Sequence, residues 1–224
     1  MAAQQTGEIG FLDRKRVAAE ALRLVDEQGF GRLTMRNLAA RLDVVPMALY
    51  RHVASKQELV DAVFDLATST IELPDASLDW RRGLESLARS IRLHLLEHPA
   101  IAVGILGRPA LGPAALDIAE YGYMVMRNAG FSDADTIAGV NTLVTYVLGF
   151  TALEVPRRQT DGSGPTPELA RLASQYRDLP VDRYPHTANL QPAIDSIVSP
   201  EQFDQGLQTL LDGLDRKLHE PAPY

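Results

Sequence analysis

The chain has 224 residues, of which 46% are hydrophobic and 23% are charged. This composition is close to that of an average soluble protein and supplies enough apolar side chains for a sizeable core, so a wholly disordered chain is excluded. Cysteine is absent, which excludes disulfide bonds, thiolate metal sites and a cysteine nucleophile.

Neither a secretory signal nor a membrane span is expected. The first ten residues contain no basic segment followed by an apolar one. The longest apolar segment, residues 137–153, is interrupted by Asn141 and three threonines. Because a membrane-spanning helix needs about 18 or more apolar residues in succession, we expect a cytoplasmic protein.

Charge is distributed unevenly along the chain. The formal net charge is −7, yet residues 1–60 contain nine Lys or Arg against seven Asp or Glu. Between Thr34 and Lys56 the only acidic residue is Asp43. This distribution suits a small DNA-contacting part attached to an acidic body that does not bind DNA.

Apolar residues recur at three- and four-residue spacing, and strand-like alternation is hardly visible, so we predict an all-α fold. The predicted helices, in chain order, span residues 13–28, 34–42, 46–53, 55–72, 77–97, 114–128, 133–155 and 200–218. The helix 133–155 is apolar nearly all round, which predicts a central helix packed on every side. Gly139 and Gly149 are expected where neighbouring helices approach it closely.

Individual residues mark the ends of the N-terminal helices. Gly29 suits a C-cap and Thr34 an N-cap. Pro46 fits the first position of a helix, where a missing N–H costs nothing. Ser55 followed by Glu58 forms a capping box, which predicts the start of the fourth helix.

Residues 34–53 have the layout of a helix-turn-helix, with two short helices, a break of about three residues and the small Ala39 where the helices cross. The second of these helices presents Met47, Tyr50 and Arg51 on the face opposite its apolar side. Taken alone, the pattern fits an ordinary helical hairpin with solvated charges equally well.

The segment 33–60, LTMRNLAARLDVVPMALYRHVASKQELV, closely resembles the DNA-binding signature of the tetracycline-repressor (TetR) family. The likeness covers residues 12 to about 64. The positions that carry it are Thr34, Leu38, Ala39, Leu42, Pro46, Leu49, Tyr50, His52, Ser55, Lys56 and Leu59. The resemblance implies an all-α homodimeric repressor, with an N-terminal three-helix helix-turn-helix domain and a helical ligand-binding and dimerisation domain, that releases DNA when a small ligand binds.

The same resemblance implies roles for individual residues. Arg36 would read a base or contact a nearby phosphate, and the residues implied at base edges are Pro46, Met47 and Ala48. The residues implied to hold the DNA backbone are Thr34, Tyr50, His52 and Lys56.

Two positions depart from the family pattern. Asp43 stands where glycine is common, but aspartate tolerates left-handed backbone, so the turn is expected to persist. Val45 replaces a common serine, so the third helix is expected to begin without a side-chain cap.

Residues 78–218 resemble, more distantly, the ligand-binding domain of the tetracycline repressor. The points of likeness are Trp80, Arg108–Pro109, Asn128–Phe131, Leu148–Gly149 and Leu153–Glu154. Where that domain has its magnesium-binding histidine and a neighbouring threonine, this chain has Gly104 and Gly107. The resemblance therefore does not extend to a tetracycline–magnesium site, and no cofactor is expected.

The ligand site is expected between the long helices, in a pocket lined by apolar side chains with a few polar groups. The candidate lining residues are Leu87, Ile91, Val103, Leu106, Met124, Asn141, Tyr146 and Phe150. Packing in the core is the alternative explanation for each of them. An apolar lining favours a hydrophobic or amphipathic compound.

An enzymatic function has little support. His94–His98 reads HLLEH and matches the inverted zinc-protease pattern H-x-x-E-H, but a catalytic zinc also needs a further ligand and an open cleft. His98 lies next to Pro99 at a predicted helix end, where a cation complements the helix dipole. The sequence contains no Gly-x-Ser-x-Gly elbow, phosphate-binding loop or dinucleotide fingerprint.

The leading hypothesis is a ligand-responsive DNA-binding transcriptional regulator. Residues 1–60 would bind DNA, a linking helix would extend to about residue 72, and residues 75–224 would bind ligand and dimerise. The dimer surface is expected on the helix 133–155 and on the stripe 203–214. Expected partners are a palindromic operator, a small-molecule effector and a second copy of the chain. The alternative is a helical small-molecule-binding protein or enzyme with a vestigial helix-turn-helix, and the sequence does not separate a repressor from an activator.

Overall fold

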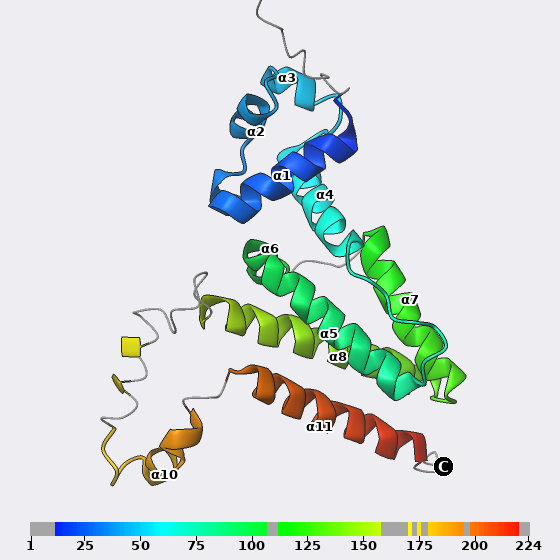
Figure 1. Cartoon of the computed structure of the whole chain (residues 1–224), viewed down its shortest axis with the longest axis vertical. Helices are drawn as coiled ribbons and strands as arrows, with labels where there is room; N and C mark the ends of the chain where they lie inside the picture. Colours follow the sequence, from blue (N-terminus) through cyan, green and yellow to red (C-terminus); the bar gives the residue numbers. More distant parts are fainter. Residues whose placement is uncertain are drawn as a thin grey trace, which may run out of the picture. The chain divides into compact units, whose positions relative to one another are not determined.

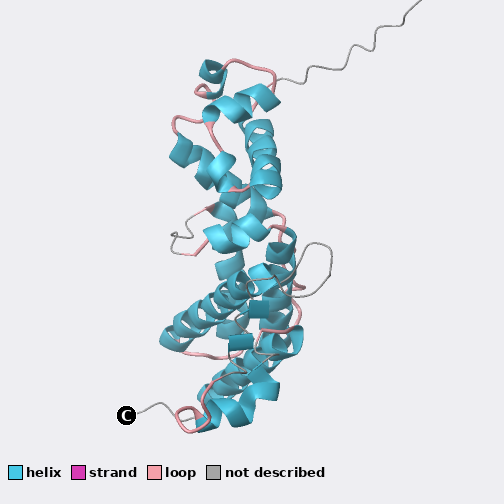
Figure 2. Ribbon diagram, turned by 90° about the vertical axis from the view of Figure 1, so that its left-hand side faces the viewer, coloured by secondary structure: helices cyan, strands magenta, loops and turns pink. Residues whose placement is uncertain are grey.

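The computed structural model describes residues 12–106, 112–157, 170–171, 174–175, 179–194 and 198–219. Over these residues the chain is all-α, as predicted, and contains no strand (Figures 1 and 2). The backbone divides into two compact units, Met1–Thr70 and Ile71–Tyr224.

Over its described residues the first unit has a 3₁₀ turn at Phe30–Arg32 and four α-helices. Their bounds are α1 Arg14–Gln28, α2 Met35–Arg41, α3 Pro46–Leu49 and α4 Lys56–Ser69. Helix α1 packs along α4 and also touches α2, and the Phe30 and Phe64 rings stack with their centroids 5.1 Å apart. The fully buried side chains of this core include Val17, Leu24, Leu33, Leu38, Leu49, Leu59 and Val63.

Two helices of the first unit are shorter than predicted. Helix α3 ends at Leu49, because the chain then turns through bonds from the Arg51 and His52 N–H groups to carbonyls three residues back. Helix α4 ends at Ser69 rather than near residue 72. The hydroxyls of Thr68, Ser69 and Thr70 each donate to a carbonyl oxygen three or four residues back, and such bonds compete with continued helix.

The second unit is also helical. Its helices are α5 Trp80–Glu97, α6 Pro99–Gly104, α7 Pro113–Asn128, α8 Asp133–Glu154, α10 Pro185–Ile194 and α11 Pro200–His219, with a 3₁₀ turn at Val155–Arg157. Helix α5 starts at Trp80 rather than 77, because the Asp79 side chain accepts a hydrogen bond from the Arg82 N–H and caps it there. Helices α5, α7 and α11 all pack against α8.

Helix α8 is central, but the prediction that it is packed on every side is wrong for the single chain. One face is open, with Ile137 60% and Leu153 57% exposed. By length and composition α8 is also the one candidate membrane span among the described residues. Its packing against three helices is that of a core helix in a folded bundle.

The two glycines predicted at close approaches to α8 behave differently. A methyl group at Gly139 would lie 2.7 Å from the Met126 methyl carbon and 3.0 Å from a Leu214 methyl carbon, so the close approach there is confirmed. Within the chain, a methyl group at Gly149 would meet nothing within 4 Å. Gly149 lies on α8 away from its neighbours, so that prediction is wrong.

A buried ion pair joins three helices of this unit. The Arg92 guanidinium donates from Nε and Nη2 to the Glu154 carboxylate over 2.8 and 2.7 Å. The same guanidinium lies 4.6 Å above the centroid of the Phe203 ring. Arg92 on α5, Glu154 on α8 and Phe203 on α11 therefore hold these three helices together at one point.

Gly206 is a second point of close helix contact. A methyl group there would overlap the Tyr146 hydroxyl oxygen, which donates to the Phe203 carbonyl over 2.8 Å. Gly206→Ala should lower the free energy of unfolding by about 1–2 kcal/mol, because overpacking outweighs the gain in helix propensity. Urea unfolding measures the change. A gain of about 0.5–1 kcal/mol, which helix propensity alone would give, would contradict the packing.

Candidate nucleic-acid interface

Helix α3 is the second helix of the helix-turn-helix, the recognition helix, and is called the reading helix below. A tight turn after α2 fixes its position. Asp43 adopts the left-handed conformation, with φ of 54°, so the predicted turn persists without glycine. The Val44 N–H donates to the Ala39 carbonyl over 3.0 Å, and Ala39 itself is buried. Val45 forms no side-chain cap and Pro46 opens the helix, both as predicted.

Hydroxyl caps hold the helices that flank α3. The Thr34 hydroxyl accepts from the Asn37 N–H over 3.1 Å, and the Ser55 hydroxyl accepts from the Glu58 N–H over 3.1 Å. The Glu58 carboxylate in turn accepts from the Ala54 N–H. Both predicted caps are confirmed, and Lys56 lies exposed at the first position of α4.

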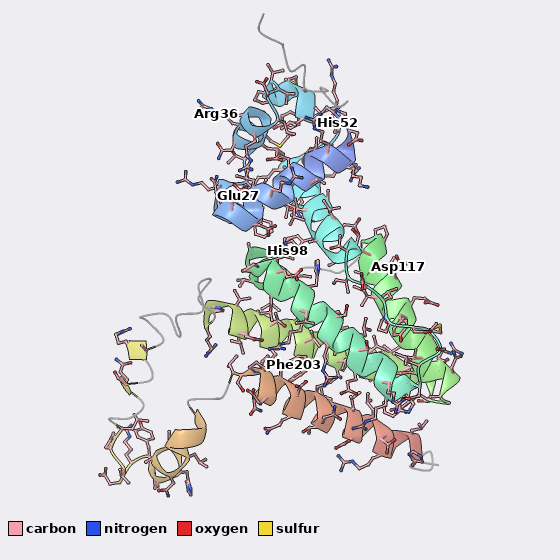
Figure 3. All side chains as sticks on the ribbon, viewed as in Figure 1. Glu27, Arg36, His52, His98, Asp117 and Phe203 are labelled. Carbon is pink, nitrogen blue, oxygen red and sulfur yellow. The ribbon has the colours of Figure 1, made fainter. Side chains whose placement is uncertain are left out.

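The predicted DNA-contacting residues differ in exposure. The exposed residues are Arg36, Pro46, Met47, Tyr50 and Lys56, and the half-buried ones are Thr34, Ala48 and His52. The Arg36 side chain extends outward from α2 (Figure 3). Within the described part of the chain, Arg36, Arg51 and Lys56 have no ion-pair partner. Their positive charge is therefore available to an anionic partner.

Arg41 belongs to the same basic segment but has a structural role. Its guanidinium forms ion pairs of 2.6 Å with Glu20 and with Glu27, both on α1. The hydrogen bonds with Glu27 and Glu20 raise the pKa of Arg41, and the hydrogen bond from Arg41 lowers the pKa of the Glu27 carboxyl. Arg41 thus ties α2 to α1, a contact that the sequence pattern alone does not reveal.

The eight candidate ligand residues differ in burial. Leu87 and Ile91 are buried in α5. Tyr146 and Phe150 lie together beside Phe203, with ring centroids 5.4 to 5.7 Å apart. Met124 is half-buried, and the exposed candidates are Val103, Leu106 and Asn141. Gly104 ends α6, whereas Gly107 and Arg108–Pro109 lie outside the described residues.

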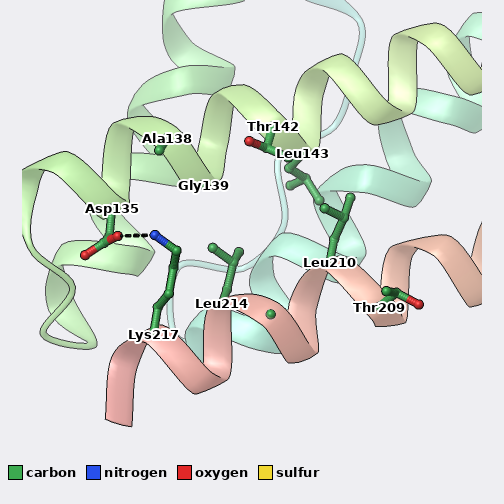
Figure 4. Close-up of a pocket in the computed structure, with 10 residues that line it drawn as sticks. Asp135, Ala138, Gly139, Thr142, Leu143, Thr209, Leu210, Leu214 and Lys217 are labelled. Carbon is green, nitrogen blue, oxygen red and sulfur yellow. Dashed lines mark hydrogen bonds and ion pairs between the residues drawn. The ribbon is translucent and has the colours of Figure 1, made fainter. Parts of the chain in front are cut away.

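A groove that the sequence analysis did not single out lies between α8 and α11. It has a volume of about 320 Å³, and none of the eight ligand candidates lines it. The lining residues are Asp135, Ala138, Gly139, Thr142, Leu143, Thr209, Leu210, Gly213, Leu214 and Lys217. At one end the Lys217 ammonium pairs with Asp135 over 2.8 Å (Figure 4), which lowers the pKa of that carboxyl. The small residues at 138, 139 and 213 are the sequence signal that could have indicated it.

The two histidines of the HLLEH motif lie side by side near the end of α5, with ring centroids 4.8 Å apart. No group of three or more potential metal ligands occurs in the parts of the chain that the structure describes. The geometry therefore adds no third ligand to this pair.

The fold and the exposed basic face of α2, α3 and α4 define a helix-turn-helix DNA-binding protein. Residues 18–63 match the family described as bacterial regulatory proteins, tetR family. Residues 73–218 match the tetracyclin repressor-like C-terminal domain. The chain therefore belongs to the TetR family of bacterial transcriptional regulators, which confirms the predicted resemblance.

Individual relatives agree with this assignment. An HTH-type transcriptional regulator from Saccharopolyspora erythraea is 32% identical over 204 residues, covering 91% of this chain and 84% of the relative. The Streptomyces coelicolor TetR family protein ActR, in complex with actinorhodin, gives a TM-score of 0.83 at 28% identity and covers 94% of this chain and 99% of its own. BioQ from Mycobacterium smegmatis, with its double-stranded DNA operator, gives 0.66 at 33% identity, with 92% and 99% covered.

Proposed function

We propose that the protein is a cytoplasmic homodimeric repressor that binds a palindromic operator and releases it when a small molecule binds. The observation that carries this proposal is the exposed face of α2, α3 and α4, where Arg36, Arg51 and Lys56 have no ion-pair partner among the described residues. A helix presented in this way fits the major groove of DNA.

Each residue of this face has a proposed role. Arg36 contacts a base, and the side chains at 46–48 lie against base edges. The residues that hold the DNA backbone are Thr34, Tyr50, His52 and Lys56. The DNA-binding domain is residues 1–60, α4 is the link, and residues 75–224 bind the effector and dimerise. Positive side chains at phosphates position the duplex, whereas contacts with base edges select its sequence.

The dimer surface is the open face of α8 together with the groove beside α11. Exposed Ile137 and the groove residues Leu210 and Leu214 supply apolar area that a second copy would cover. The predicted stripe 203–214 contributes only in part, because Phe203, Leu207 and Leu211 are fully buried within the chain. Two copies would place two reading helices on half-sites about one helical turn apart.

The effector is a hydrophobic or amphipathic compound. The TetR family protein ActR, which this chain resembles over nearly its whole length, has been crystallised with actinorhodin. In this chain the candidate residues Tyr146 and Phe150 form an aromatic cluster with Phe203, next to the buried Arg92 guanidinium. The compound would release DNA by favouring a dimer geometry with another spacing of the reading helices.

Arg36→Ala tests the DNA-binding face. It should weaken operator binding by about 1–3 kcal/mol if Arg36 contacts a base, measured by gel-shift titration on DNA selected from a random duplex library. Lys56→Ala should weaken binding to all sequences alike and make the salt dependence less steep, because one phosphate contact is lost. Arg82→Ala, which removes an exposed arginine of the second unit, is the control. Unchanged affinity of Arg36→Ala would count against its role, and binding insensitive to salt would favour the vestigial helix-turn-helix.

A further inference from the structure

The first unit concentrates its exposed apolar surface on the reading helix. Among its described residues, the large hydrophobic side chains that are exposed are Val45, Met47 and Tyr50, at 68%, 71% and 48%. All three belong to α3 or to the residues that cap it. Isolated exposed apolar side chains are ordinary, but their restriction to this helix marks a contact surface.

The start of α3 can form almost no side-chain hydrogen bonds. Residues 45–48 are Val, Pro, Met and Ala. None of these side chains has a donor, and the only acceptor is the weak thioether sulfur of Met47. Among the base edges of the major groove, which present donors and acceptors, the C5-methyl group of thymine is the apolar feature.

The charges around this patch indicate DNA as its occupant. Arg36 lies on α2, Arg51 follows α3, and Lys56 opens α4. In the described part of the unit none of the three forms an ion pair. An apolar helix flanked along the chain by unpaired cations fits a base edge flanked by phosphates, whereas an apolar protein partner would leave these cations without counter-charges.

Building on the proposed function, we propose that Val45 and Met47 select operator half-sites by contacting thymine methyl groups, while polar base selection falls to Arg36 and Arg51. Cytosine has only a hydrogen at the position of this methyl group, and a purine would place an amino group or a keto oxygen near an apolar side chain, where it loses its hydrogen bonds to water. Arginine can form two hydrogen bonds with the O6 and N7 atoms of guanine. The operator half-site should therefore combine thymine under the start of α3 with guanine beside it.

The test removes single methyl groups from the DNA. The full-length protein first selects its operator from a random duplex library, and each thymine is then replaced by deoxyuridine in both half-sites. At one or two positions per half-site we expect affinity to fall about fourfold per methyl group, or about sixteenfold for the symmetric pair, which corresponds to ~0.8 kcal/mol per group. Deoxyuridine elsewhere should have no effect.

Variants of the two side chains show which of them contacts each thymine methyl group. Met47→Ala should weaken binding to the thymine duplex and lose sensitivity to deoxyuridine at one of these positions, and Val45→Ala should do so at another. Leu116→Ala removes an apolar side chain of α7 that is also exposed, at 57%, and should change neither property. Both variants alter exposed side chains, so circular dichroism should show an unchanged fold.

The experiment distinguishes failure of the thymine contact from failure of the proposed repressor function. If the protein selects an operator whose affinity does not depend on any thymine methyl, or if Met47→Ala and Val45→Ala respond to deoxyuridine as the wild type does, the thymine contact is overturned and the proposed repressor remains. If no sequence is enriched and no salt-dependent binding is seen, both proposals fail.

Discussion

Glu154→Ala should lower the free energy of unfolding by about 3–5 kcal/mol, measured by urea unfolding at fixed protein concentration. The substitution leaves the Arg92 guanidinium without its carboxylate partner in a site where the two side chains are only 11% and 4% exposed. An uncompensated buried charge is among the most costly single defects in a core. The contact of Arg92 with the Phe203 ring would not replace two charge-assisted hydrogen bonds.

Two controls distinguish the cost of an unpaired buried charge from a nonspecific loss of stability. Replacing both partners, with Arg92→Met and Glu154→Leu, should restore most of the stability, because no charge then remains buried. Arg127→Ala removes one partner of an exposed pair with Asp133, whose side chains are 66% and 77% exposed, and should cost less than about 1 kcal/mol. A loss below 1 kcal/mol for Glu154→Ala would show that the pair does not hold α5 and α8 together.

Ala138→Arg should abolish dimerisation and weaken operator binding about 100- to 10,000-fold. Ala138 is exposed on α8 and lines the groove beside α11, so the single chain tolerates a longer side chain there. In a dimer that uses this face, the arginine would be buried without a partner. A monomer engages one half-site and loses the effective concentration that linkage of two reading helices provides.

Analytical ultracentrifugation measures the oligomeric state, and gel-shift titration measures operator affinity. Ser86→Arg places the same side chain at an exposed position of α5 and should leave both unchanged. If Ala138→Arg stayed dimeric and bound its operator normally, the dimer surface would have to lie elsewhere. A variant that stayed dimeric but had lost DNA binding would contradict dissociation as the cause of the weaker binding.

Features that depend on residues close in sequence were predictable. The caps at Thr34 and Ser55, the turn at Asp43 and the start of α3 at Pro46 each depend on backbone groups within about four positions. The helical periodicity and the motif at 33–60 were sufficient for the all-α fold and for the TetR family. The surface that we assign to DNA was therefore accessible from the sequence, although the roles of its residues stay predictions.

Features that depend on distant residues were not predictable. The sequence pattern does not distinguish Arg41, which is paired with α1, from Arg36, which is not. Leu211 and Leu210 are neighbours on an apolar stripe, yet the first is fully buried and the second lines a groove. Periodicity identifies which side chains are apolar, but only packing decides which of them the chain itself covers.

The amino-acid sequence by itself determined the class of the protein, the position of its reading helix and the ends of most helices, because local backbone hydrogen bonding and helical periodicity specify these. Only the tertiary structure decided that Arg92 and Glu154, 62 residues apart in sequence, form a buried pair, and that one face of α8 remains open. Both depend on which helices meet, and that choice is made by the packing of the whole unit.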